Sequence, residues 1–209
     1  MTLSWDLLYT VTVWGCWAIF CLVWAAGAIY NALHAPPAEQ RRAGLNAWLV
    51  GVVLIIAIRG LVPQQLWAAL TFDMPLLRVV GVALLLVSTV FTVWARFSLG
   101  TMWTSSAVVK REHQLRTSGP YAITRHPIYT GVLGMLMGTL LMSGVGAWIG
   151  YLIVGVAVLA TKAAAEEGLL MKRFGDRYRE YRERVPALVP GLGRLRPPYR
   201  QARPSSEVS

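Results

Sequence analysis

Side chains able to bind or orient a charged molecule gather in two stretches of the chain. The first follows a Ser-Gly-Pro turn signal and opens an apolar run; its members are Tyr121, Arg125, His126 and Tyr129. The second closes a later apolar run and contributes Lys162, Glu166 and Glu167. Together they offer cations, an imidazole, phenol rings and two carboxylates, which suits a polar ligand with charges of both signs. Adjacent carboxylates at a membrane boundary need partners, because an unpaired buried charge is costly.

Each of these side chains also has a purely structural interpretation. Arg125 is typical of a charge that anchors a helix at the inner face of a membrane, and Tyr121 and Tyr129 are typical of an interfacial aromatic belt. Lys162 and Glu166 are four residues apart, a spacing that favours a surface ion pair on one helix. The functional interpretation therefore depends on whether the two stretches meet in space.

Several common cofactor and metal motifs are missing from the sequence. No GxGxxG follows a strand, and no Walker loop, HExxH or CxxC occurs. The three histidines, His34, His113 and His126, lack the spacing of metal ligands. Cys16 and Cys21 lie on well-separated faces of one apolar helix, so a disulfide between them does not fit. A Rossmann nucleotide site is disfavoured, and we expect no metal.

The composition indicates a chain embedded in a membrane. Of its 209 residues, 56% are hydrophobic and only 14% are charged, whereas soluble domains carry about 25% charged residues. Apolar stretches cover residues 7–30, 47–61, 76–95, 128–142 and 145–160, the second continuing through Pro63 to Leu70. The first lacks a basic n-region, so we expect a retained transmembrane helix and not a signal peptide. Gly27 and its alanine neighbours offer close packing to another helix.

The basic residues select the topology. With five spans and the N-terminus outside, eighteen of the twenty Lys and Arg residues fall on one side of the membrane, leaving Arg59 and Arg78 near the other. The positive-inside rule therefore predicts an all-α integral membrane protein with five transmembrane helices, N-out and C-in, whose cytoplasmic loop and C-terminal helix form a pocket. The net charge of +10 follows this topology, and we expect no nucleic-acid partner.

Connectivity brings the two polar stretches to the same membrane face. A turn of small residues joins 128–142 to 145–160, which predicts a tight helical hairpin. The start of its first helix and the end of its second then meet at the cytoplasmic face. Residues 163–184 should continue the second helix out of the membrane, with a break at Phe174-Gly175-Asp176. We divide the chain into N-terminal membrane helices (1–95), a core (96–192) and a basic disordered tail (193–209).

Motifs within residues 96–192 carry a resemblance to a known family. In chain order they are Ser118-Gly119-Pro120-Tyr121, Arg125-His126-Pro127-Ile128-Tyr129-Thr130-Gly131, Glu166-Glu167, Phe174-Gly175-Asp176-Arg177-Tyr178-Arg179-Glu180-Tyr181 and Val185-Pro186. This set resembles the signature of the isoprenylcysteine carboxyl methyltransferase family, to which phospholipid N-methyltransferases are related. The N-terminal half carries no motif beyond apolar helices.

The resemblance implies an integral-membrane methyltransferase that binds S-adenosylmethionine without a Rossmann domain. It assigns cofactor contacts to a His-x-Leu segment, the turn tyrosine, a His-Pro-x-Tyr stretch and a glutamate on the last membrane helix. In this chain these are His113, Gln114, Leu115, Arg116, Tyr121, His126, Pro127, Ile128, Tyr129 and Glu166. A basic residue four positions before that glutamate contacts the methyl acceptor. The family has Arg there and this chain has Lys162, which supplies charge but no bidentate fork.

The chemistry of methyl transfer suggests roles for these residues. Tyr121 and Tyr129 can stack on the adenine or favour the sulfonium through cation–π attraction. An ionised acceptor carboxylate needs orientation and no general base, and Lys162 and Arg125 are the candidates to orient it. An amine acceptor would need a group that takes a proton, and Glu167 is the first candidate. We therefore predict Arg125, Lys162 and Glu167 as the catalytic residues.

Three alternative hypotheses stay open at this point. The chain could be a phospholipid amine N-methyltransferase, an NADPH-dependent oxidoreductase similar to membrane sterol reductases, or a non-enzymatic scaffold whose basic tail binds anionic lipid. In the preferred hypothesis the acceptor is a lipophilic small molecule or lipid-modified substrate that enters sideways from the membrane lipids. The cofactor arrives from the cytoplasm. The sequence makes no prediction of oligomeric state.

Overall fold

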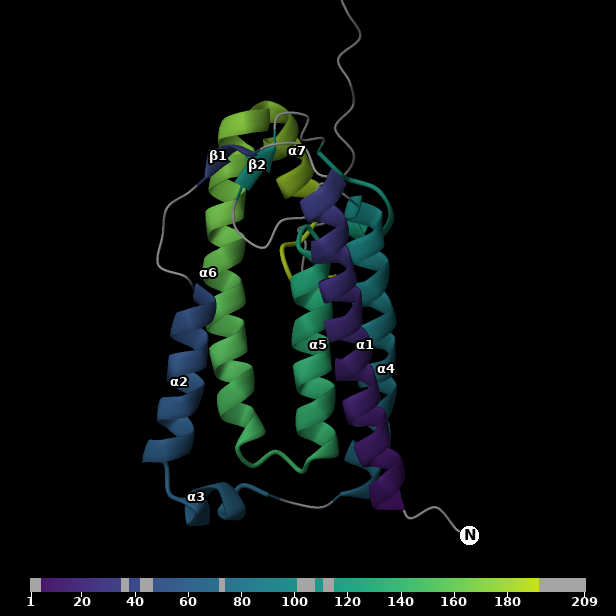
Figure 1. The fold of residues 1–209 in the computed structure, drawn as a ribbon, viewed down its shortest axis with the longest axis vertical. Helices are drawn as coiled ribbons and strands as arrows, with labels where there is room; N and C mark the ends of the chain where they lie inside the picture. Colours follow the sequence, from purple (N-terminus) through teal and green to yellow (C-terminus); the bar gives the residue numbers. More distant parts are fainter. Residues whose placement is uncertain are drawn as a thin grey trace, which may run out of the picture.

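The computed structural model describes residues 5–34, 38–41, 47–71, 74–100, 108–110 and 115–191. These residues form seven α-helices: α1 (Trp5–His34), α2 (Ala47–Leu61), α3 (Gln64–Ala69), α4 (Pro75–Leu99), α5 (Pro127–Met142), α6 (Trp148–Phe174) and α7 (Asp176–Arg184). A 3-10 helix, η2 (Gly119–Ala122), precedes α5, and strands β1 (Ala38–Arg41) and β2 (Val108–Lys110) pair antiparallel. Helices α1, α2, α4, α5 and α6 run along a common direction, with α3 at one end and α7 at the other (Figure 1).

Three helices are long and apolar enough to cross a bilayer. They are α1 over Leu7–His34, α4 over Pro75–Leu99 and α6 over Trp148–Phe174. Helices α2 and α5 are also apolar but shorter, over Val50–Leu61 and Pro127–Met142. Large apolar side chains point outward along these helices, as a surrounding lipid phase would favour. The helical, apolar architecture predicted from the composition is confirmed.

The second apolar stretch differs from its expected course. Helix α2 ends at Leu61, and Pro63 separates it from α3. Proline has no N–H to continue the helical ladder, and the backbone at Pro63 is extended, with φ −58° and ψ 142°. The predicted continuation to Leu70 is therefore broken, and its last part forms the short α3 at the end of the bundle.

Helices α4 and α5 approach each other through glycine. A methyl group added at Gly131 of α5 would lie 1.8 Å from Thr92 Oγ1, and one added at Gly138 would lie 2.7 Å from the backbone nitrogen of Leu85. Both distances are far shorter than a van der Waals contact, so only glycine permits this approach. Leu85 and Met135 are fully buried beside the contact. This rigid pair supports the start of α5, where the first polar stretch lies.

Helix α1 packs against this pair. A methyl group added at Gly27 would lie 2.3 Å from Arg96 Nη2, so the space beside Gly27 is occupied by the guanidinium of Arg96 from the end of α4. The neighbour predicted for Gly27 is therefore a side chain and not a closely approaching helix backbone. Trp17 Nε1 donates a hydrogen bond of 3.1 Å to Thr139 Oγ1 of α5. The cysteines are free, with Cys16 buried and Cys21 exposed.

The predicted hairpin of α5 and α6 is confirmed. The two helices are joined at one end, so the start of α5 and the end of α6 lie at the other (Figure 1). Helix α6 runs without interruption to Phe174, and Gly175, with φ +52°, separates it from α7. The break predicted at Phe174-Gly175-Asp176 is therefore confirmed. A positive φ is accessible to glycine without steric cost, which lets the chain turn sharply into α7.

The β1–β2 pair was not predicted. Its strands have four and three residues, too short to show an alternating pattern of apolar and polar side chains. The domain boundary expected at residue 95 falls within α4 and stays a prediction. The tail expected at 193–209 lies outside the described residues.

Candidate active site

An arginine–glutamate pair joins three elements at the open end of the hairpin. Arg125 lies in the turn before α5, and Glu167 lies on α6. Arg125 Nε and Nη2 donate to Glu167 Oε1 at 3.0 and 2.7 Å. Arg125 Nη1 donates to the backbone carbonyls of Arg182 and Val185 at 3.0 and 2.5 Å. Only 9% of the Arg125 side chain and 15% of the Glu167 side chain are exposed, so the turn, α6 and α7 are tied together by a largely buried ion pair.

His126 bridges the two adjacent glutamates. Its Nε2 lies 3.3 Å from Glu167 Oε1, and its Nδ1 lies 3.5 Å from Glu166 Oε2. Burial lowers the pKa of His126, but the hydrogen bonds and charges of Glu166 and Glu167 outweigh burial and raise it above the ordinary 6.5. The protonated imidazolium, in which both nitrogens donate, is thereby favoured.

Glu166 faces the aromatic side of the site. Tyr129 Oη donates a hydrogen bond to Glu166 Oε1. The Tyr129 and His126 rings are stacked, with centroids 5.5 Å apart and 6° between their planes. Lys162 Nζ lies 6.0 Å from the centroid of the Tyr129 ring. The Glu166 side chain is 28% exposed, so its carboxylate is more accessible to a ligand than that of Glu167.

The chain after α7 returns to the turn before α5. The backbone N–H of Arg125 donates to Pro186 O at 2.8 Å, and that of His126 donates to Ala187 O at 3.1 Å. These bonds satisfy the two amides and fix the backbone from which both side chains project. The order of the site therefore depends on a segment about sixty residues away in the sequence.

Tyrosines from η2 and α7 close the site on another side. Tyr181 Oη donates a buried hydrogen bond of 2.6 Å to the backbone carbonyl of Tyr121. Tyr178, one turn earlier on α7, is also buried. Burial raises the pKa of Tyr121, and the charge of Glu166 raises it further, so its hydroxyl stays protonated. Tyr121 is therefore held in place as a neutral member of the same cluster.

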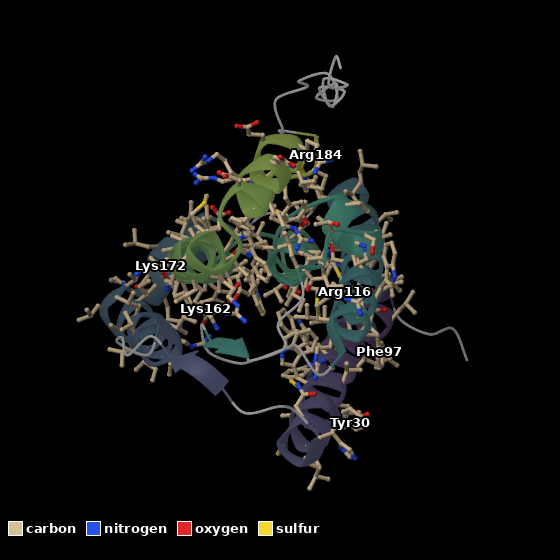
Figure 2. All side chains as sticks on the ribbon, turned by 90° about the horizontal axis from the view of Figure 1, so that it is seen from above. Tyr30, Phe97, Arg116, Lys162, Lys172 and Arg184 are labelled. Carbon is tan, nitrogen blue, oxygen red and sulfur yellow. The ribbon has the colours of Figure 1, made fainter. Side chains whose placement is uncertain are left out.

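The structure gathers most of the predicted site residues at one end of the bundle. Those that share contacts there are Tyr121, Arg125, His126, Tyr129, Lys162, Glu166 and Glu167. Pro127 and Ile128 are buried in the first turn of α5 and serve its packing. Leu115 is half-buried and Arg116 exposed. Viewed onto this end, Lys162 lies on the α6 side and Arg116 on the α4 side (Figure 2). His113 and Gln114 lie outside the described residues.

Some contributors to the site were not predicted. Arg182 Nε lies 3.6 Å from Glu167 Oε2 and adds a second cation to that carboxylate. Arg96, buried at the end of α4, is close enough to Tyr121 to oppose the rise in its pKa. The three-residue spacing of Tyr178 and Tyr181 in a charged segment was a usable signal, because it places both rings on one helical face.

The contacts indicate different tasks for the two glutamates. Glu167 Oε1 already accepts two hydrogen bonds from Arg125 and faces His126, so little of its hydrogen-bonding capacity is left for a proton or a ligand. Four of the hydrogen bonds of Arg125 go to the protein itself. This geometry suits both residues to positioning. The predicted catalytic roles of Arg125, Lys162 and Glu167 stay predictions.

The remaining donor set fits S-adenosylmethionine. Glu166 presents a partly exposed carboxylate, which suits an ammonium or ribose hydroxyls. The Tyr129 ring, with the Lys162 ammonium 6.0 Å from its centroid, is an aromatic face of the kind that attracts cations. Within the described ranges, no group of three or more His, Cys, Asp or Glu side chains is placed to hold a metal.

Comparison with known proteins identifies relatives of this site. Residues 76–177, from α4 into α7, match the phospholipid methyltransferase family. The chain is 33% identical over 114 residues to protein-S-isoprenylcysteine O-methyltransferase B of Arabidopsis thaliana, which covers 53% of this chain and 57% of that protein. Protein-S-isoprenylcysteine O-methyltransferases of Schizosaccharomyces pombe and Xenopus laevis are 32% and 30% identical, over 38% and 54% of this chain and 34% and 41% of those proteins. The chain thus spans about half or less of each relative, and the predicted family resemblance is confirmed.

Proposed function

We propose that the chain is a membrane methyltransferase that uses S-adenosylmethionine, because residues 76–177 match the phospholipid methyltransferase family. The proposed reaction is O-methylation of the carboxylate of a lipophilic, isoprenylcysteine-type acceptor. The observation that carries this proposal is the pairing of Glu166 and Glu167 on α6 with His126 and Tyr129 at the start of α5. This arrangement holds a partly open carboxylate beside an aromatic surface at the end of an apolar bundle.

The proposed topology places this site at the cytoplasmic face. It has five spans, formed by α1, α2, α4, α5 and α6, with the N-terminus outside and the C-terminus inside. The helix lengths support α1, α4 and α6 directly. Helices α2 and α5 would cross a thinned bilayer or be extended by interfacial residues. The basic residues of α7 then lie on the side that the positive-inside rule assigns to the cytoplasm.

The cofactor would lie between α6 and the start of α5. Glu166 would bind its ammonium or ribose hydroxyls, and Tyr129 and Tyr121 would contact the adenine or the sulfonium. When bound, S-adenosylmethionine supplies an electrophilic methyl group. Tyr129 is held for this task by Glu166 and by stacking on His126. His126 in turn is fixed by both glutamates and by its backbone bond to Ala187.

Lys162 is proposed to orient the acceptor. It lies one helical turn before Glu166 and close to the Tyr129 ring. An ionised carboxylate is already nucleophilic, so it needs a cation that holds its oxygen in line with the methyl group and no base. The Arg125–Glu167 pair keeps α6 and the turn in register, so that Lys162 and Tyr129 stay on the same side of the site. Exclusion of water by the apolar helices would favour the charge-dispersing transfer.

A methyl-transfer assay tests the proposal. Purified protein in detergent is given methyl-labelled S-adenosylmethionine with either N-acetyl-S-farnesylcysteine or phosphatidylethanolamine. A methyl ester releases labelled methanol in base, whereas an N-methyl group stays bound. We expect base-labile label on the farnesylcysteine, and strong loss of transfer in Glu166→Gln but not in Glu180→Gln, an exposed residue of α7. Base-stable label on the phospholipid would show that the acceptor is an amine and not a carboxylate. If calorimetry detected binding of NADPH but no binding of S-adenosylhomocysteine, the chain would be an oxidoreductase and not a methyltransferase.

A further inference from the structure

A cavity opens at the end of the bundle opposite the candidate active site. Its volume is about 590 Å³, and side chains from α1, α2, α4, α5 and α6 line it. Its wall includes Met142 and Ser143 at the end of α5, whereas His126 stands at the start of that helix. With 16 residues in α5 and a rise of about 1.5 Å per residue, the two ends are roughly 24 Å apart. The cavity is therefore separate from the proposed methyl-transfer site.

The inner part of the cavity suits a hydrocarbon chain. Its wall there is made by Val13, Trp17, Ile55 and Leu136. The α1 residues that line it extend from Tyr9 to Trp17, which corresponds to about 12 Å along the helix. A cavity with this extent and lining buries apolar surface when a chain enters it, which is favourable.

The outer part of the cavity carries an arginine. Arg78, in the first turns of α4, lines the wall, and its Cζ lies 5.5 Å from the centroid of the Tyr9 ring. Arg59 Nη1 donates a 2.8 Å hydrogen bond to the hydroxyl of Tyr151, another lining residue, so a second guanidinium contacts the cavity wall through that tyrosine. Among the described residues that line the cavity, none is acidic. Guanidinium groups bind phosphate oxygens in a bidentate manner.

The apolar inner part and the outer part with the arginine are arranged like the acyl chain and the headgroup of a bilayer lipid. Arg78 and Tyr9 lie near the helix ends that meet the membrane surface, and Trp17 lies two turns deeper along α1. We propose that this cavity binds an anionic phospholipid, with its phosphate at Arg78 and Arg59 and one acyl chain between α1 and α5. The bound lipid would brace α1, α4 and α6 against one another at this end.

Lipid binding tests this proposal without using activity. Delipidated protein in detergent is incubated with dioleoylphosphatidylglycerol or with dioleoylphosphatidylcholine, and bound lipid is counted by native mass spectrometry alongside the melting temperature. We expect one tightly bound phosphatidylglycerol, a higher melting temperature with it, and weaker binding of phosphatidylcholine. Arg78→Gln should weaken phosphatidylglycerol binding about tenfold or more, because it removes a charge-assisted contact with the phosphate.

Two further variants separate the site from general charge effects. Arg177→Gln removes an equal charge at an exposed position of α7, at the opposite end of the bundle, and should leave lipid binding unchanged. Thr10→Trp adds bulk at an exposed position of the cavity wall without changing charge, and should displace the lipid. Equal binding of the two lipids, equal losses in Arg78→Gln and Arg177→Gln, or full binding in Thr10→Trp would each overturn the proposal. So would the same stabilisation by inorganic phosphate alone. Affinity for S-adenosylhomocysteine, measured in parallel, reports whether each variant is folded.

Discussion

Replacement of Arg125 by glutamine should destabilise the protein strongly. Arg125→Gln removes the cation that gives Glu167 two of its hydrogen bonds, and it also frees the carbonyls of Arg182 and Val185. With only 15% of the Glu167 side chain exposed, its carboxylate would lose most of its compensation. Breaking one side of a buried ion pair generally costs about 3–5 kcal/mol. The cost is smaller here, because Glu167 is partly exposed and keeps His126 and Arg182 as neighbouring partners. We therefore expect the free energy of unfolding to fall by about 2–4 kcal/mol.

The expected loss of unfolding free energy can be measured as a shift in melting temperature. In a chain of this size, 1 kcal/mol shifts the midpoint by about 2–4 °C, so Arg125→Gln should melt roughly 4–16 °C below the parent. Tryptophan fluorescence during heating in detergent would follow the transition. The double variant Arg125→Gln with Glu167→Gln should recover part of the loss, because it leaves no uncompensated carboxylate.

A surface ion pair provides the matched control. Arg179 Nη1 lies 2.6 Å from Asp176 Oδ1, but the two side chains are 64% and 83% exposed. Exposed pairs contribute little, so Arg179→Gln should change the midpoint by no more than a few degrees. Equal shifts in Arg125→Gln and Arg179→Gln would refute the assignment of Arg125 as the residue that ties the turn, α6 and α7 together.

Three further predictions rest on single contacts. Gly131→Val should lower the free energy of unfolding by about 1–3 kcal/mol and reduce the yield of monodisperse protein in size-exclusion chromatography, because its Cβ would collide with a threonine of α4. Gly60→Val should keep the yield of the parent, because Gly60 has no neighbour within 4 Å, and equal yields of the two variants would contradict the prediction. Tyr181→Phe should lower the free energy of unfolding by about 1–3 kcal/mol, because it leaves a buried backbone carbonyl of η2 without its hydrogen bond. Tyr178→Phe should lower it less, because the Tyr178 hydroxyl has no hydrogen-bond partner among the described residues. Equal shifts in melting temperature would contradict this. Because the folded-state pKa of His126 is raised, its protonation stabilises the fold fully below pH 6.5, and this stabilisation is lost as pH rises through the folded-state pKa. His126→Gln should remove the corresponding fall in melting temperature with rising pH. A pH profile of melting temperature equal to that of the parent would contradict the prediction.

The sequence was sufficient to bring the two polar stretches together. Helices joined by a short turn must run antiparallel, so the residues at the start of α5 and at the end of α6 lie at one face whatever the details of packing. The contacts of Tyr129 and His126 with Glu166 and Glu167 confirm this inference. The break at Gly175 was also predictable, because glycine interrupts an otherwise continuous helical pattern.

The contacts made by the chain after α7 were not predictable in the same way. The backbone N–H groups of Arg125 and His126 donate hydrogen bonds to the carbonyls of Pro186 and Ala187, and these bonds leave no local pattern in the sequence. Backbone pairing between distant segments depends on the path of the intervening chain, which propensity and periodicity do not specify. The same holds for Gly27, where a close neighbour was predictable but its identity as the Arg96 side chain was not.

The two adjacent glutamates explain how one site can be both rigid and open. Neighbouring residues on a helix point about 100° apart, so Glu166 and Glu167 face different surroundings. Glu167 turns toward Arg125 and the end of α7, where protein donors occupy it, while Glu166 turns toward Tyr129 and is more exposed. His126 contacts both carboxylates and therefore couples the fixed side to the accessible one. A ligand that draws Glu166 away from His126 would weaken one of the two contacts that raise the pKa of this imidazole. Ligand binding at a pH near the folded-state pKa of His126 should therefore release a proton, which calorimetry in buffers of different ionisation enthalpy would detect.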